Sequence, residues 1–259
     1  LFRSPNLYHN QLQEDVAGLL TGDKDYLAFF CNSGAEANEA AIKIARKASG
    51  KQEIITFQNS FHGRTFGSMS ATGQDKIKQG FGEGVPHFSY AIFNDMDSVK
   101  ALANKETSAI MLELVQGESG VQPADKAFVK ALSDYCQETG IYLIVDEVQT
   151  GIGRTGKLFA YEHYDIEPDI FTLAKGLANG VPVGAMLAKS SLGGAFSYGS
   201  HGSTFGGNKL SMAAAKATLE VMLTPGFLDT ALENGNKLQV KLQEVLSDKE
   251  KIGRAHVWT

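Results

Sequence analysis

The chain is poor in cysteine: its 259 residues include only Cys31 and Cys136. Two cysteines make neither a disulfide framework nor a zinc site, so we predict no metal centre and a reducing, cytoplasmic location. The apolar runs are too short to span a membrane. The net charge is −5 and lysine and arginine form no cluster, which argues against nucleic acid as a partner. With 43% hydrophobic residues, the composition is that of an ordinary globular protein.

Neither end of the chain has the features of a natural terminus. Leu1 stands where a start methionine is expected, and the residues Ile252–Thr259 (IGRAHVWT) interrupt the amphipathic pattern before them. We expect the chain to be a fragment and residues 252–259 to be a translated sequencing adaptor. A genomic read that continues in frame through IGRAHVWT would contradict this.

Apolar runs and amphipathic segments alternate along the chain. Continuous apolar runs predict buried strands, and apolar residues at helical spacing predict helices. The predicted strands are 27–31, 53–57, 108–114, 141–145, 170–173 and 183–188, and the predicted helices are 12–20, 35–49, 127–139, 210–223 and 228–246. This alternation indicates an α/β fold with helices on both faces of a mostly parallel sheet. Ligands bind such sheets at the carboxyl ends of the strands.

Two predicted strand ends carry groups suited to a charged ligand. Asn32–Ala37 follows a strand and opens a helix, where free N–H groups favour a phosphate. Alone, a plain turn with Ser33 as N-cap explains it better. Asp146 and Glu147 directly follow the strand 141–145, where a buried carboxylate needs a cationic partner such as a protonated pyridine nitrogen. An ordinary acid at a strand end and a magnesium ligand are the alternatives.

Lys175 comes shortly after the apolar run Ile170–Leu173. Lysines are seldom buried, and a desolvated lysine has a lowered pKa and can bond covalently to a carbonyl group. A lysine that points to solvent from a loop is the commoner case. The interval from Asp146 to Lys175 is long enough for a crossover helix between parallel strands, so the two residues could meet at neighbouring strand ends.

Two further segments combine groups that recognise flat or anionic ligands. In Phe61–Thr65, the aromatic ring could stack on a flat cofactor and Arg64 could bind a carboxylate. The alternative is a core phenylalanine beside a surface arginine. In His201–Asn208, Ser203 or Thr204 could bind a phosphate, or the segment could be a flexible turn.

The order and spacing of the motifs are more specific than any one of them. SGAEA, FHGRT, ELVQGE, DEVQTGIGRTG, LAKG and HGSTFGGN together resemble the class III aminotransferases of fold type I, of the ornithine and acetylornithine type. The resemblance runs from about Asn6 to Leu223. It implies a large domain that binds pyridoxal 5′-phosphate (PLP) at residues 1–223, truncated at its N-terminus. A helix at 224–251 would then lead to a missing small domain, and 252–259 would be a non-native tail.

The resemblance assigns a role to each matching residue. Lys175 matches the lysine that holds PLP covalently and later moves a proton, and Asp146 matches the partner of the ring nitrogen. Phe61 and Val148 match the contacts on the two faces of the ring, and Gln149 matches the residue near the ring hydroxyl. The implied cofactor-binding residues are Gly34, Ala35, Phe61, Asp146, Glu147, Val148, Gln149, Lys175 and Thr204.

The implied substrate-binding residues are Arg64, Ser203 and Glu118. Arg64 matches the arginine that binds the α-carboxylate, and Glu118 the acid that pairs with a switching arginine in the missing small domain. Thr204, beside Ser203, matches the loop that reaches the phosphate of the neighbouring subunit, which implies a homodimer with shared active sites. Leu114 stands where the family usually has proline, and we expect a small local effect.

The expected activity is transfer of the terminal amino group of N2-acetyl-L-ornithine to 2-oxoglutarate, a step of arginine biosynthesis. Ornithine, succinylornithine or 4-aminobutyrate could replace this donor, and a fragment could bind PLP without turnover. An NAD-dependent dehydrogenase built on Gly151–Gly156, which spells G-x-G-x-x-G, is a weaker alternative. The first glycine of that motif should follow the strand almost at once, and Asp146–Thr150 intervene.

Overall fold

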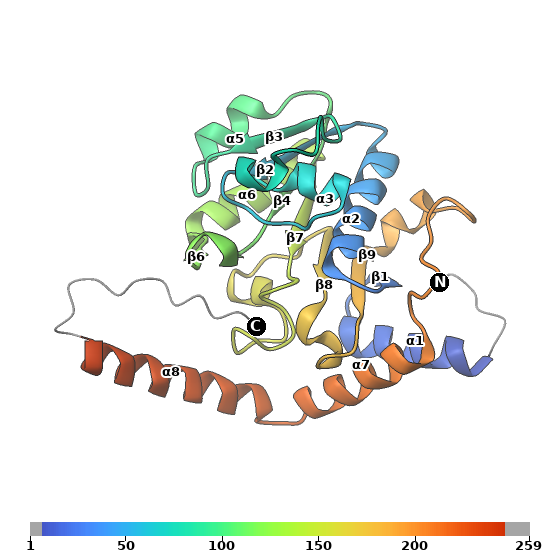
Figure 1. Ribbon diagram of the computed structural model, residues 1–259, viewed down its shortest axis with the longest axis vertical. Helices are drawn as coiled ribbons and strands as arrows, with labels where there is room; N and C mark the ends of the chain where they lie inside the picture. The colour runs from blue at the N-terminus through green and yellow to red at the C-terminus, as the bar shows by residue number, and fades with distance from the viewer. Residues whose placement is uncertain (1–6, 247–259) are drawn as a thin grey trace.

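The computed structural model describes residues 7–246, and its centre is a sheet of seven strands in the order β1-β9-β8-β7-β4-β2-β3 (Figure 1). The strands are β1 Tyr26–Cys31, β2 Glu53–Phe57, β3 Phe88–Ala91, β4 Thr107–Leu112, β7 Tyr142–Asp146, β8 Ile170–Leu173 and β9 Gly184–Lys189. All neighbouring strands are parallel except that β9 is antiparallel to both β1 and β8. The predicted α/β fold with a mostly parallel sheet is confirmed.

The helices lie on both sides of this sheet (Figure 1). They are α1 Leu7–Thr21, α2 Gly34–Ser49, α3 Phe66–Ala71, α4 Asp75–Lys78, α5 Met96–Leu102, α6 Lys126–Thr139, α7 Lys209–Met222 and α8 Phe227–Leu246. Four short 3-10 helices, η1 Gly117–Ser119, η2 Ala160–His163, η3 Lys175–Ala178 and η4 Ser190–Ala195, and a two-stranded ribbon of β5 Val115–Gln116 and β6 Gln122–Pro123 complete the described chain.

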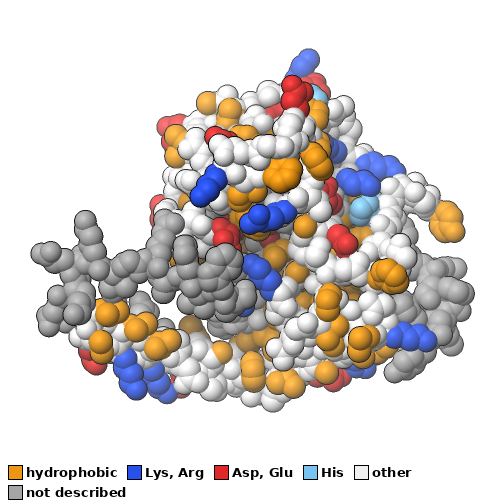
Figure 2. Space-filling model, in the orientation of Figure 1, with side chains coloured by type: hydrophobic (Ala, Val, Ile, Leu, Met, Phe, Trp, Pro, Cys, Tyr) orange, Lys and Arg blue, Asp and Glu red, His pale blue; other side chains and the backbone are white. Residues whose placement is uncertain are grey.

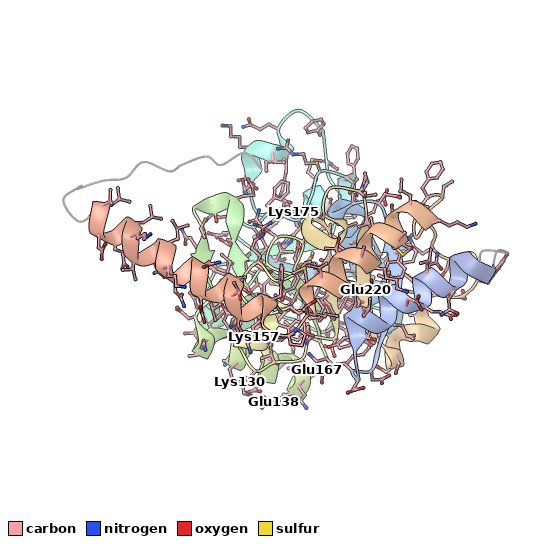
Figure 3. The ribbon with its side chains drawn as sticks, turned by 90° about the horizontal axis from the view of Figure 1, so that it is seen from below. Lys130, Glu138, Lys157, Glu167, Lys175 and Glu220 are labelled. Atoms are coloured by element: carbon pink, nitrogen blue, oxygen red, sulfur yellow. The ribbon has the colours of Figure 1, made fainter. Side chains whose placement is uncertain are left out.

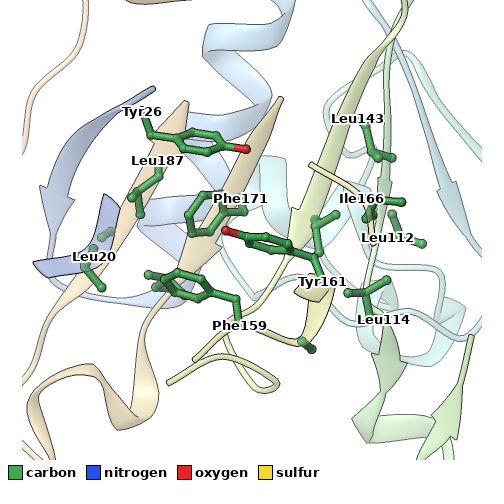
Figure 4. Packing of buried hydrophobic residues seen from close by; sticks show 14 of the residues in the cluster. Leu20, Tyr26, Leu112, Leu114, Leu143, Phe159, Tyr161, Ile166, Phe171 and Leu187 are labelled. Atoms are coloured by element: carbon green, nitrogen blue, oxygen red, sulfur yellow. The ribbon is translucent and has the colours of Figure 1, made fainter. Parts of the chain in front are cut away.

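Side-chain alternation divides the sheet between two hydrophobic cores. On β7, Leu143 and Val145 point to a larger core that includes residues of α1, α6 and α7. Ile144, between them, points to a smaller core formed with α2. Figure 4 shows aromatic rings of the larger core, in which Phe171 packs edge-on against Tyr161 with centroids 5.4 Å apart. Each fully buried aromatic of this kind contributes about 1.5–3 kcal/mol of hydrophobic stabilisation.

The structure differs from the sequence expectations at a few places. The predicted strand 108–114 ends at Leu112, and β3 was not predicted. The chain between Asp146 and Lys175 contains η2 and β8 and no α-helix, so the crossover there is a loop. Residues 252–259, the expected non-native tail, lie outside the described residues. No described helix is both long enough and apolar enough to cross a membrane.

Helix α8 leaves the body of the molecule at its C-terminal end (Figure 1). Its first two turns pack closely against the loop 151–156. A Cβ added to Gly153 would collide with Leu228, and one added to Gly156 would collide with Leu232. None of its residues is buried, and Leu238, Val240 and Val245 are more than half exposed. Figure 2 shows hydrophobic side chains along the visible face of this helix. The division of the chain into a large domain and a leading helix stays a prediction.

Candidate active site

A cavity of about 480 Å³ opens at the carboxyl ends of the parallel strands. Nine of the residues singled out from the sequence line it: Gly34, Ala35, Phe61, Arg64, Glu118, Asp146, Val148, Gln149 and Lys175. They come from five separate segments of the chain, so only the fold brings them together. In Figure 3, Lys175 lies towards the middle of the molecule, whereas Lys130 and Glu138 of α6 lie at its edge.

Asp146, the last residue of β7, lies at the buried wall of the cavity with 4% of its surface exposed. Alternation places it on the same face as Ile144, towards α2. Its Oδ2 accepts hydrogen bonds of 2.8 Å each from Asn38 Nδ2 and His62 Nδ1, and its Oδ1 accepts one of 3.0 Å from the Val148 N–H. These donors, together with the Thr172 hydroxyl at a longer 3.4 Å from Oδ1, fix the carboxylate in one orientation and help to offset the cost of burying it.

Asn38 connects three elements around this carboxylate. Its second amide hydrogen goes to the His62 carbonyl at 2.6 Å, and its Oδ1 accepts from the Thr172 hydroxyl at 2.7 Å. Asn38 is 1% exposed and all its hydrogen-bonding groups are used. Because one side chain links α2, the segment after β2 and β8, the position of Asp146 is determined by the packing of all three.

Lys175 begins η3, two residues after β8 ends, and has a φ of 42°. Such a left-handed backbone is costly for a residue with a side chain, and conformations of this kind cluster at functional sites. Its amine makes no hydrogen bond or ion pair within the described chain. Burial lowers the pKa of Lys175, while the nearby carboxylates of Asp146, Glu118 and Glu113 act in the opposite direction. A lowered pKa leaves more of the amine unprotonated and nucleophilic.

The first turn of α2 forms the side of the cavity suited to an anion. The Ser33 hydroxyl caps the helix by accepting the Glu36 N–H at 3.2 Å, and the Glu36 carboxylate accepts the Asn32 N–H at 2.6 Å. The Gly34 and Ala35 N–H groups, which have no helical partner, donate no hydrogen bond within the described residues. A Cβ on Gly34 would lie 2.6 Å from Val148 Cγ1, so only glycine fits at this position.

Phe61 and Arg64 reach the cavity from the loop that follows β2. The Arg64 guanidinium carbon lies 5.9 Å from the centre of the Phe61 ring. Arg64 is exposed and forms no ion pair with any described residue, so its charge is available to a carboxylate. Gly63 between them has a φ of 134°, and a Cβ there would lie 2.4 Å from the Ser68 hydroxyl. Glycine is therefore required for the bend that presents both side chains.

Glu118 and Gln149 line the cavity from two further loops. A Cβ on Gly117 would almost coincide with Gln149 Oε1, at 1.4 Å, so the two loops pack closely. Glu118, next to Gly117, is exposed and has no ion-pair partner among the described residues. From these loops the cavity thus presents Glu118 as an exposed acid, in addition to Arg64 as an exposed cation.

Three of the singled-out residues lie outside this cavity. Glu147 points to the opposite face of the sheet, where its carboxylate accepts the Thr150 hydroxyl at 2.5 Å and the Tyr161 N–H at 2.8 Å. Burial raises the pKa of Glu147 to about 7. Ser203 and Thr204 line a second cavity of about 360 Å³. Asn32, which lines both cavities, donates to the Ser203 hydroxyl at 3.0 Å.

The residues that sequence reasoning missed are those that support Asp146 or lie beside it: Asn38, His62, Glu113 and Thr172. Asn38 gave a usable signal, because it is a polar residue on the Ala-rich face of α2 that packs against the sheet. His62 lies in the segment Phe61–Thr65 but was given no role of its own. Glu113 is the first residue of the ELVQGE motif but was given no role, and Thr172 had no local signal, since it is an uncharged residue within the strand β8.

Comparisons with known proteins agree on one family. The profile of the class-III aminotransferases matches residues 4–256. The chain is 72% identical to the acetylornithine aminotransferase of Streptococcus mutans, over 95% of this chain and 65% of that protein. It is 56% identical to the acetylornithine aminotransferase of Bacillus subtilis, over 93% of this chain and 63% of that protein. The chain therefore spans slightly less than two thirds of the length of these curated relatives.

Solved structures give the same result for the fold. The ornithine aminotransferase of Toxoplasma gondii superposes with a TM-score of 0.88 at 31% identity, covering 96% of this chain and 61% of that one. The taurine:2-oxoglutarate aminotransferase of Bifidobacterium kashiwanohense, solved with PLP and glutamate, superposes with a TM-score of 0.85 at 27% identity, covering 95% and 62%.

Proposed function

Because the chain belongs to the class-III aminotransferase family, we propose that it is the PLP-binding core of an enzyme that transfers amino groups between amino acids and 2-oxo acids. The observation that carries the proposal is that Asp146 and Lys175 line the same cavity. It contains a carboxylate held by three donors and an amine with a lowered pKa. A cofactor with a cationic ring nitrogen and a reactive carbonyl group matches this pair.

The remaining walls of the cavity fit the same cofactor. The free Gly34 and Ala35 N–H groups would hold the phosphate, and the Phe61 ring and Val148 would contact the faces of the pyridine ring. When bound, PLP supplies an electron-withdrawing ring that stabilises negative charge on the substrate. Asp146 would keep a proton on the ring nitrogen, and Lys175 would move the proton at the reacting carbon.

The substrate is expected to be an amino acid whose carboxylate meets Arg64. We propose N2-acetyl-L-ornithine as amino donor and 2-oxoglutarate as acceptor, supported by 72% identity to an acetylornithine aminotransferase. Ornithine is the second candidate, supported by the likeness to an ornithine aminotransferase at 31% identity. Measuring kcat/KM with both donors in the full-length protein separates them, and a preference for ornithine would overturn the first assignment.

We also propose that the protein acts as a homodimer in the cytoplasm. Thr204 lies outside the cavity of its own chain and is exposed, so it is free to reach the cavity of a second copy. Large apolar side chains are exposed near it in the chain, among them Tyr198, Phe205 and Leu210. Mixing Lys175→Ala with Thr204→Ala subunits tests this, because a shared site would give hybrid dimers with one intact site. If mixing recovered no activity, the shared-site proposal would fail.

An absorbance spectrum tests the cofactor assignment directly. We expect the protein with PLP to show a visible band that sodium borohydride bleaches, and Lys175→Ala to lack the borohydride-sensitive component. A folded wild-type protein without such a band would contradict the proposed function.

A further inference from the structure

Glu113 is a buried acid in the proposed active site to which the mechanism above gives no task. It directly follows β4, which lies next to β7 in the sheet, so Glu113 and Asp146 stand at the ends of neighbouring parallel strands. Glu113 lines the same cavity as Lys175 and is 6% exposed. A carboxyl group in such a place is costly unless it has a partner.

The partner of Glu113 is a backbone group. Its Oε2 accepts the Phe61 N–H at 2.9 Å, and this is its only hydrogen bond within the described residues. Burial raises the pKa of Glu113 to about 7, with His62, Asp146 and Lys175 as the nearby charged or titratable groups. The carboxyl group thus serves to anchor Phe61.

Phe61 begins a four-residue segment that ends at Arg64 and carries three functional side chains. His62, the second residue, is held by three hydrogen bonds. Its N–H donates to the Thr72 hydroxyl at 2.9 Å, its carbonyl accepts from Asn38 at 2.6 Å, and its imidazole donates to Asp146 at 2.8 Å. Phe61 has no such side-chain anchor, because its ring lines the open cavity.

The bond from the Phe61 N–H to the Glu113 carboxylate therefore holds one side of the peptide before Phe61, whose other side, the Ser60 carbonyl, accepts the Gly73 N–H at 3.2 Å. Without the hydrogen bond to Glu113, the backbone dihedral angles of Phe61 could change and its ring could move, while His62 stayed in place. Arg64 would move less, because His62 and Gly63 separate it from the released bond.

We propose that Glu113 is a positioning residue, which holds the Phe61 ring over the cavity by accepting the Phe61 N–H. The proposal rests on the proposed function, since Phe61 is there the residue that contacts the ring of PLP. The position of Phe61 then depends on the hydrogen bond that Glu113 accepts and not on the charge of Glu113.

Two substitutions separate the hydrogen bond from the charge. Glu113→Gln keeps an acceptor oxygen at the same reach and removes the charge. Glu113→Asp keeps the charge and draws the carboxylate back by one methylene. Glu113→Ala removes both the acceptor and the charge. Glu106→Gln is the control for the loss of a carboxylate, because Glu106 is exposed and directly precedes β4, at the end of the strand opposite to Glu113.

The measurements are the Kd for PLP and the circular dichroism of the bound cofactor in the full-length protein. We expect Glu113→Gln to stay within about twofold of wild type, and Glu113→Asp and Glu113→Ala to bind PLP about tenfold more weakly, with a reduced dichroism band. KM for the amino acid should change less than the Kd for PLP.

The reverse order, with Glu113→Asp near wild type and Glu113→Gln impaired, would show that the charge matters and would overturn the proposal. Equal affinity in all variants would also overturn it. Far-ultraviolet circular dichroism checks that each variant is folded, and the comparison of Gln with Asp stands without the Ala variant. A wild-type protein with no borohydride-sensitive band would instead refute the proposed function, so the two failures are distinguishable.

Discussion

The imidazole of His62 donates its Nδ1 hydrogen to Asp146 Oδ2 across 2.8 Å, and both side chains are buried. An ionised carboxylate can only accept, so the hydrogen is on Nδ1. The other ring nitrogen, Nε2, is buried and has no hydrogen-bond partner among the described residues. The histidine therefore orients the carboxylate and is itself oriented by it.

Replacing His62 by phenylalanine should weaken both folding and cofactor binding. The ring volume is nearly kept, but Asp146 loses the His62 donor, which costs about 1.5–3 kcal/mol for a bond to a charged group. We expect the free energy of unfolding, measured with urea, to fall by that amount and the Kd for PLP to rise. His163→Phe, on a histidine bonded to Thr155 outside the cavity, is the control. Equal stability of the two variants would show that the bond to Asp146 contributes little.

Replacing Asp146 by asparagine should leave the cofactor bound and slow turnover. The amide keeps one acceptor oxygen but cannot hold a proton on a ring nitrogen by charge. We expect kcat to fall about 10²- to 10³-fold, the usual effect of removing one electrostatic contact from a transition state. Steady-state rates of the full-length protein provide the measurement. Unchanged turnover would mean that Asp146 does not face the ring nitrogen.

Local patterns predicted most of the elements but not which side chains meet. The apolar runs located β2 and β8 at their observed bounds, because a buried strand needs continuous apolar residues on both faces. The reversed direction of β9 and the loop between Asp146 and Lys175 depend on the packing of distant segments, which no local pattern encodes.

The site residues that directly follow a strand could be predicted from the sequence. The residues of other helices and loops that hydrogen-bond to them could not. Strand alternation alone places Asp146 and Glu147 on opposite faces, so it could have separated their surroundings in advance. The contacts of Asn38 and His62 with Asp146 join residues 108 and 84 positions apart in the sequence, and only the fold brings them together.

Lys175→Ala should abolish the covalent attachment of PLP and the transfer reaction together. The variant keeps the cavity and Asp146, so PLP should still bind non-covalently but without a borohydride-sensitive band. Mass spectrometry after borohydride should find the cofactor mass on the peptide of Lys175 in wild type and on no peptide in the variant. Full activity in the variant would refute the role of Lys175.

Arg64→Ala should raise KM for amino acids and leave PLP bound. Arg64 lines the cavity and has no ion-pair partner among the described residues, so its loss removes a contact to substrate alone. Losing a hydrogen bond to a carboxylate costs about 1.5–3 kcal/mol, which corresponds to about a 10- to 150-fold rise in KM. Lys105→Ala, an equal change of charge on an exposed residue just before β4, is the control. A change in PLP affinity alone would assign Arg64 to the phosphate.

Glu147→Gln should stabilise the protein at high pH and not at low pH. Burial raises the pKa of Glu147 from 4.5 to about 7, so the folded state favours the protonated acid. This contribution to stability is complete below pH 4.5 and is lost as the pH rises through about 7, where the buried group must ionise. The neutral amide avoids that loss, and it can accept the Tyr161 N–H and donate to the Thr150 hydroxyl.

The size of this effect follows from the shift in the pKa of Glu147, which corresponds to an upper limit of about 3 kcal/mol. We expect urea unfolding of Glu147→Gln to give a higher free energy than wild type at pH 8.5 and an equal or lower one at pH 4.5. The titration of Glu113, present in both proteins, cancels in the difference. Glu106→Gln should show no such dependence, because its carboxylate is exposed. A stability difference that is the same at both pH values would mean that Glu147 is ionised in its buried position, paired there by the hydrogen bonds from Thr150 and Tyr161.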